Sequence, residues 1–162
     1  MSPSDTTHYI DVKALIDRQW GQRYRSLLVL AEDAGERSRK ARRLANSVRA
    51  YYLNLLDYFE ARPELCRRID CFDIDELEEL LLELDVPQEL VVVDAIDFLL
   101  NTWQQLQRES FTWILLDQRL DTYERGAKLF VFFALEDVYL RQYKLVNAQG
   151  KSRILRLSEV SL

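Results

Sequence analysis

Residues 36–61 read ERSRKARRLANSVRAYYLNLLDYFEA and carry a clear helical pattern. At 100° per residue, one face of such a helix collects the apolar side chains Leu44, Val48, Tyr51, Leu55, Tyr58 and Phe59. The arginines fall on the opposite face. The segment is followed by Arg62-Pro63, and a proline disfavours helical geometry at the residue before it. The pattern predicts one two-sided helix that ends near residue 61.

Apolar residues also recur every three to four positions on both sides of this segment, which predicts further helices. The chain has only 4 glycines and 3 prolines, a composition that favours long helices over many short strands joined by tight turns. Asp73 is placed to cap one helix, Pro63 and Pro87 each to open one, and Gly35 to close one. The expected helices span residues 11–34, 63–69, 73–84, 87–108, 111–116 and 121–142.

The C-terminal segment has a different pattern. Two short extended runs within residues 143–158 flank Asn147-Ala148-Gln149-Gly150, which predicts an antiparallel β-hairpin. Residues 1–10 are polar and contain Pro3, so a flexible tail is expected. The predicted fold class is mainly α: a compact multi-helix bundle with a small C-terminal β-hairpin, in a single domain over residues 1–162.

Several kinds of catalytic site are excluded by residue type alone. His8 is the only histidine, which excludes a Ser-His-Asp triad and the zinc motif HExxH. The glycines are too far apart for GxGxxG or the phosphate-binding motif GxxxxGK[ST]. Asp94 and Asp97 lie one helical turn apart, but no nucleophile or metal ligand accompanies them as an acid/base pair. We therefore expect a protein that is not an enzyme and has no cofactor.

The sequence gives little support for a metal site or for secretion. Cys66 and Cys71 lack a second cysteine pair for zinc, so they are expected to be buried free thiols. The segment from Asp70 to Asp75 lacks the glycine of a calcium loop, and no metal is predicted. The N-terminus has no signal-peptide pattern, and the longest apolar run, Leu129–Leu135, is too short to span a membrane. A cytoplasmic location is expected.

Charge is strongly segregated along the chain. Residues 37–49 hold six basic side chains and no acid, whereas residues 70–85 hold eight acids and no base, within a net charge of −5. The arginine face is either a solvated helix surface, a partner of the acidic segment, or a binding surface for an anionic macromolecule. The acids of residues 70–85 either bind a basic partner, or they stabilise the N-terminus of a helix and line its solvent-exposed face.

These observations predict a non-catalytic adaptor, assembly factor or subunit of a larger complex that docks macromolecular partners through charged helix faces. The alternative is a subunit that contacts a nucleic-acid backbone through the Arg37–Arg49 helix and the basic hairpin, although a pI near 5.0 counts against it. A protein partner is expected, nucleic acid is the second choice, and the oligomeric state stays open. The predicted partner-binding residues are Arg37, Arg39, Lys40, Arg42, Arg43, Arg49, Lys151, Arg153 and Arg156.

Overall fold

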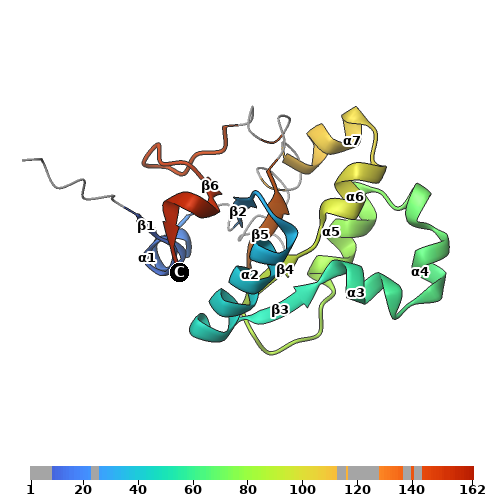
Figure 1. Cartoon of the computed structure of the whole chain (residues 1–162), viewed down its shortest axis with the longest axis horizontal. Coiled ribbons are helices and arrows are strands. Elements are labelled where there is room, and N and C mark those ends of the chain that lie inside the picture. Colours follow the sequence, from blue (N-terminus) through green and yellow to red (C-terminus); the bar gives the residue numbers. More distant parts are fainter. Residues whose placement is uncertain (1–8, 23–25, 113–115, 117–127, 137–139, 141–143) are drawn as a thin grey trace, which may run out of the picture.

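A parallel β-sheet forms the centre of the protein in the computed structural model, which describes residues 9–22, 26–112, 116, 128–136, 140 and 144–162 (Figure 1). All neighbouring strands in this sheet run parallel. The order across it is β3 (Tyr51–Asn54), β4 (Leu90–Asp94), β5 (Leu129–Leu135), β2 (Ser26–Ala31) and β6 (Ile154–Arg156). The protein is therefore α/β, and the predicted mainly-α bundle with a C-terminal hairpin is wrong.

The three central strands are continuous apolar runs: β2 reads SLLVLA, β4 LVVVD and β5 LFVFFAL. Every residue of these strands is buried except half-buried Leu135. A parallel strand covered on both faces shows no polar and apolar alternation, so its sequence resembles part of a buried helix. For this reason three expected helices, residues 11–34, 87–108 and 121–142, are interrupted by β2, β4 and β5 respectively. A fourth, residues 36–61, is interrupted by the half-buried edge strand β3.

Helices precede, connect and follow these strands. Their bounds are α1 Val12–Gln19, α2 Ala34–Val48, α3 Leu55–Glu60, α4 Pro63–Arg67, α5 Ile74–Leu82, α6 Asp97–Thr102 and α7 Gln105–Ser110, with short 3-10 turns at Ile69–Cys71 and Leu157–Glu159. The expected start of α5 is confirmed, because the Glu76 backbone N–H donates to Asp73 Oδ1 over 2.9 Å. Pro63 opens α4 as predicted. Gly35 lies inside α2 instead of closing the preceding helix. Of the expected helix 111–116, residues 113–115 lie outside the described part.

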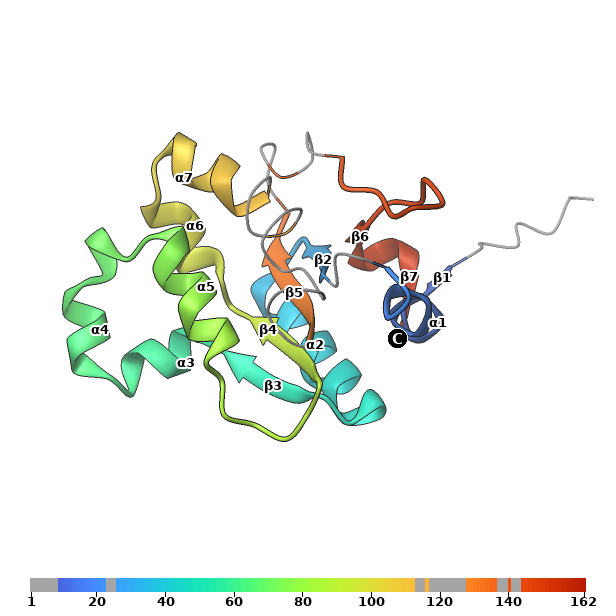
Figure 2. The ribbon, with the colours of Figure 1, turned by 180° about the vertical axis from the view of Figure 1, so that it is seen from behind.

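Two apolar cores lie on the two faces of the sheet, because alternate strand residues point to opposite sides. On one face, α1 and α2 pack against Leu27, Val29, Val92, Val131 and Phe133. On the other face, α3, α5 and α6 pack against Leu28, Leu30, Val91, Val93, Phe130 and Phe132. Figures 1 and 2 show the arrangement from both sides, with α2 in front of the sheet in Figure 1 and α5 in front in Figure 2.

The C-terminal segment reverses direction where expected but does not form the predicted hairpin. The Gly150 backbone N–H donates to the Asn147 carbonyl over 3.0 Å, and a single antiparallel bridge joins Val146 to Ser152. The next residues form β6, which pairs parallel to β2. A second, two-stranded parallel sheet joins β1 (Ile10–Asp11) to β7 (Val160–Ser161), so residue 10 of the expected tail is in a strand.

Residues 1–8 of that tail lie outside the described part. No helix in the described ranges is long and apolar enough to span a bilayer.

Candidate functional site

The carboxyl ends of the central strands carry a buried polar cluster. It consists of Arg37 from α2, Tyr52 from β3, Asp94 at the end of β4 and Asp97 at the start of α6. In open α/β sheets, ligands bind in the crevice beyond the carboxyl ends of the strands. This edge is therefore the first place to look for a catalytic site.

The side chains of this cluster are bonded to one another. Arg37 Nε donates to Asp94 Oδ1 over 2.8 Å, and Arg37 Nη1 pairs with Asp97. Tyr52 Oη donates to Asp94 Oδ2 over 2.5 Å. Asp94 is fully buried and Arg37 is 8% exposed. The cluster ties α2, β3, β4 and α6 together, and the Arg37 guanidinium is directed inward, away from any partner.

Backbone donors complete the cluster. The Ala95 N–H donates to Asp94 Oδ1 over 2.8 Å, with Ala95 held at a φ of 60°, and the Leu135 N–H donates to Asp97 Oδ1 over 2.5 Å. Burial raises the pKa of the Asp97 carboxyl, although the Leu135 N–H and the Arg37 guanidinium oppose the shift. Burial, and then the bond to Asp94, raises the pKa of Tyr52. Since each carboxylate is engaged by at least two donors of the chain, we assign the cluster a structural role.

The connection from β2 to α2 is not built to hold phosphate. Phosphate-binding proteins carry GxxxxGK[ST] between such a strand and helix, whereas residues 31–38 here read AEDAGERS. Arg37 occupies the position of the lysine, but it pairs with carboxylates. The Asp33 carboxylate accepts the Glu36 N–H over 2.9 Å and so occupies the end of α2 where an anion would bind.

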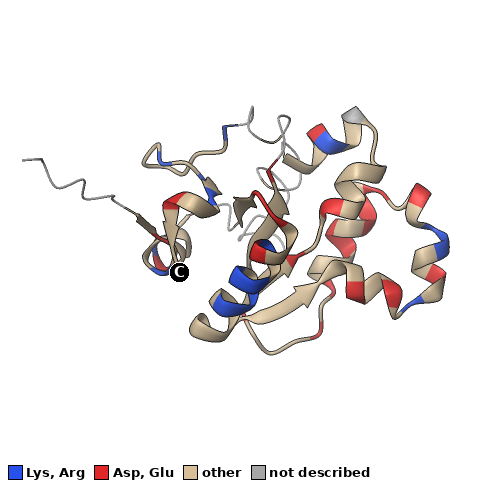
Figure 3. Cartoon of the chain, viewed as in Figure 1, with Lys and Arg blue, Asp and Glu red and all other residues tan. Residues whose placement is uncertain are grey.

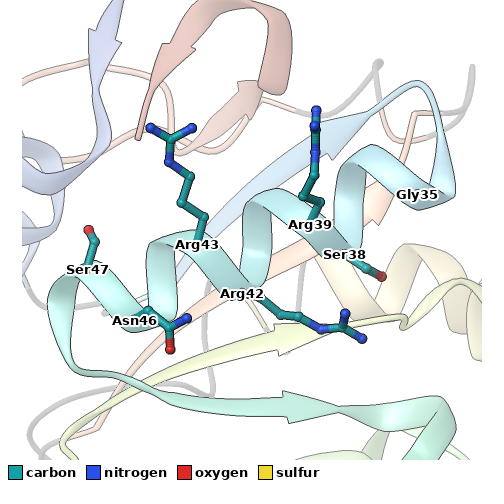
Figure 4. A pocket seen from close by; sticks show the side chains of 7 residues that line it. All are labelled: Gly35, Ser38, Arg39, Arg42, Arg43, Asn46 and Ser47. Carbon is teal, nitrogen blue, oxygen red and sulfur yellow. The ribbon is translucent and has the colours of Figure 1, made fainter.

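The outer side of α2 forms an open recess of about 770 Å³. We call it the arginine recess; its lining is Gly35, Ser38, Arg39, Arg42, Arg43, Asn46 and Ser47, all from α2. Figure 4 shows Arg39 and Arg43 projecting on one side of the helix and Arg42 on the other. All three arginines are exposed, as predicted for this face.

The three arginines differ in how far their charge is already compensated. Arg39 pairs with Glu36 one turn earlier, and this bond lowers the pKa of the Glu36 carboxyl and raises that of Arg39. The Arg42 guanidinium lies 5.6 Å from the centre of the Tyr52 ring. Arg43 makes no ion pair with any residue in the described ranges. The recess therefore presents its least compensated charge at Arg43.

The other predicted binding residues are dispersed. Lys40 is half-buried, and Arg49 is the exposed residue that ends α2 with a φ of 56°. Arg153 is buried, and it donates to the carbonyls of Ser26 over 3.1 Å and Leu116 over 2.6 Å. Arg156 pairs with Glu136 over 3.3 Å, whereas Lys151 is exposed. Only Arg39, Arg42 and Arg43 are gathered in one recess, and neither Arg37 nor Arg153 is free to bind a partner.

An acidic groove lies beside α5, with a volume of about 470 Å³. Its acids are Glu76, Glu79, Glu83 and Asp85, and its other lining residues are Tyr51, Tyr58, Arg62, Phe72, Leu80, Leu84 and Val86. Figure 3 shows the basic residues of α2 separated from the acidic residues of α3 and α5. Because α2 and α5 pack on opposite faces of the sheet, the two charge blocks do not neutralise each other within one molecule.

Metal-binding and thiol features give no further site. Among the described residues, no group of three or more His, Cys, Asp or Glu side chains is placed to hold a metal ion. Cys66 and Cys71 are free but exposed, so the expectation that they are buried is wrong. Cys66 Sγ donates to the Phe59 carbonyl over 2.9 Å.

Comparison with known proteins gives no family. Neither a protein-family model nor a curated protein matches the chain.

Proposed function

We propose that this protein is a non-catalytic subunit of a larger assembly and that it docks an acidic protein surface through α2. The observation that carries the proposal is the arginine recess, an uncovered helix face on which Arg39, Arg42 and Arg43 stand together. Arginine suits this role because its planar guanidinium pairs with carboxylates through two parallel hydrogen bonds. The internal bonding of Asp94 and Asp97 supports a non-catalytic role.

The surroundings of the recess favour an acidic protein over a nucleic-acid backbone. A nucleic acid is bound along a track of basic groups, usually on a basic domain. Here the recess is bordered at the start of α2 by exposed Glu32, Asp33 and Glu36, and the whole chain carries a net charge of −5. A small set of carboxylates on a protein fits three arginines bordered by acids better than a long phosphate chain does.

The test is a charge reversal that breaks one exposed ion pair of the chain, Arg39 with Glu36, and no buried contact. Arg39→Glu with Arg43→Glu reverses the two arginines on one side of α2 and leaves Arg42 on Tyr52. Lys13→Glu with Lys144→Glu makes the same change in net charge at two exposed lysines outside the recess. Wild-type protein and both variants are used as bait in extracts of the native cell, before and after nuclease treatment.

We expect wild type and the lysine control to retain one protein partner, and the arginine variant to lose it. The partner should withstand nuclease and dissociate as salt rises. A partner retained equally by the arginine variant would refute the proposal. Retention that disappears with nuclease, together with a high absorbance ratio at 260 and 280 nm, would replace it with the nucleic-acid alternative.

A further inference from the structure

The acidic groove holds three carboxylates without a basic partner. Glu76 pairs with Arg68 over 2.9 Å. Glu79, Glu83 and Asp85 are exposed, and they make no ion pair within the part of the chain that the structure describes. Among the described residues, Arg62 is the only basic one lining the groove, and its guanidinium lies 3.5 Å from the centre of the Tyr58 ring. The groove is thus an acidic rim around partly apolar walls.

The arginine recess matches this groove in number and spacing of charges. Three arginines on α2 face outward, and three carboxylates on and after α5 are unpaired. Arg39 and Arg43 lie four residues apart in α2. Glu79 lies in α5, and Glu83 lies four residues later, as the cap that ends this helix with its N–H bonded to the Glu79 carbonyl. Side chains four residues apart in a helix are separated by about 5–6 Å, so both pairs can meet at once.

We propose that the acidic surface bound by the arginine recess is the acidic groove of a second copy of this chain. This inference rests on the proposed function and names its partner. The exposed side of α2 in one copy, with Arg39, Arg42 and Arg43, would lie along the groove beside α5 of the next copy. Charge complementarity between two surfaces of the same chain is the argument for this occupant.

The position of the two surfaces sets the kind of assembly. They lie on elements that pack on opposite faces of the sheet, so both can be engaged in one molecule. Such a head-to-tail contact is heterologous, and it generates rings when the rotation closes and open filaments when it does not. Because the contacts are small and charged, association should be weak, strongest near about 0.01 M salt, where screening extends to about 30 Å, and lost near about 1 M, where it extends to about 3 Å.

The experiment measures the mass of pure full-length protein by sedimentation velocity over a range of concentrations. We expect wild type to form species larger than dimers at low salt and monomers at high salt. Arg39→Glu with Arg43→Glu should weaken association at least about tenfold, because the reversed charges oppose the groove. Glu79→Lys with Glu83→Lys should do the same from the other surface. Lys13→Glu with Lys144→Glu should associate like wild type.

Mixing the two defective variants gives the decisive result. In an equimolar mixture the intact recess of the glutamate variant meets the intact groove of the arginine variant, and the reversed recess meets the reversed groove, so opposite charges face each other at both contacts. The mixture should recover species larger than dimers, although each variant alone stays monomeric. The neutral pairs Arg39→Gln with Arg43→Gln and Glu79→Gln with Glu83→Gln serve if circular dichroism shows that a reversed variant is unfolded; each should weaken association less.

Two results would overturn the inference. One is wild type that stays monomeric at low salt and high concentration; the other is a mixture of variants that stays monomeric. If either occurs while the arginine variant still loses its partner from extracts, the proposed function stands and the partner is another acidic protein. If the arginine variant loses nothing in either assay, both the inference and the proposed function fail.

Discussion

Replacing Arg37 with methionine removes the only cation of the buried cluster while keeping a side chain of similar length. Asp94, fully buried, and Asp97, whose side chain is 13% exposed, would then face each other without a compensating charge. Removing one partner of a buried ion pair costs about 3–5 kcal/mol. A domain of this size loses about 2–4 °C of melting temperature per kcal/mol, so the expected decrease is about 6–20 °C.

The assay is thermal and urea unfolding of wild type and Arg37→Met, followed by circular dichroism and tryptophan fluorescence. The destabilisation should be larger at about pH 7 than at about pH 5, because burial already raises the pKa of the Asp97 carboxyl, and without its cation this group binds a proton more readily. Asp94→Asn is the matched control: it leaves Arg37 paired with Asp97 and should cost less than Arg37→Met. A melting temperature for Arg37→Met within about 2 °C of wild type would refute the view that this cluster holds the sheet edge together.

Two further predictions concern Tyr52 in β3 and Arg49, the residue that caps the end of α2. The raised pKa of Tyr52 means that the unfolded chain loses this proton before the folded one, so the contribution of Tyr52 is present below pH 10 and is lost as pH rises through the folded pKa. Tyr52→Phe should flatten this alkaline decrease in urea titrations, and an unchanged slope would contradict the assignment. Arg49→Gly relieves a φ of 56° at an exposed helix end and should stabilise the protein by about 0.5–1 kcal/mol; a lower midpoint in urea would show that Arg49 makes a stabilising contact.

The strands were not recoverable from apolar periodicity alone. A run such as Leu129–Leu135 fits a buried strand and a buried helix equally well. The composition predicted helices because strand ends normally show glycine or proline. Here the residues that follow α2 and β4, Arg49 and Ala95, have a positive φ without being glycine. The consecutive valines of β4 were the best available signal, since β-branched residues favour strands. Where turn chemistry was standard, as at Asp73 and Pro63, the predicted helix starts were confirmed.

The candidate site shows the same division. The outward positions of Arg39, Arg42 and Arg43 followed from helical geometry. The inward pairing of Arg37 did not follow from this geometry. Arg37 lies one turn before Ala41, on the buried side of α2, where an apolar residue is expected. Asp94 ends the apolar run of β4 and was the available sign that Arg37 has an acidic partner, since charged groups are buried only when they are paired.

The order of strands in the sheet has a consequence for how the chain folds. The pairing of β2 with β5 joins Ser26 to Phe130, so the first strand of the five-stranded sheet to be synthesised must wait for about a hundred residues before its neighbour exists. Closing such a loop precedes any gain from the contact, and folds dominated by distant pairings reach the native state in milliseconds to seconds. Until β5 arrives, β2 has apolar side chains on both faces and an unpaired backbone, which is the form of nascent chain most prone to aggregate.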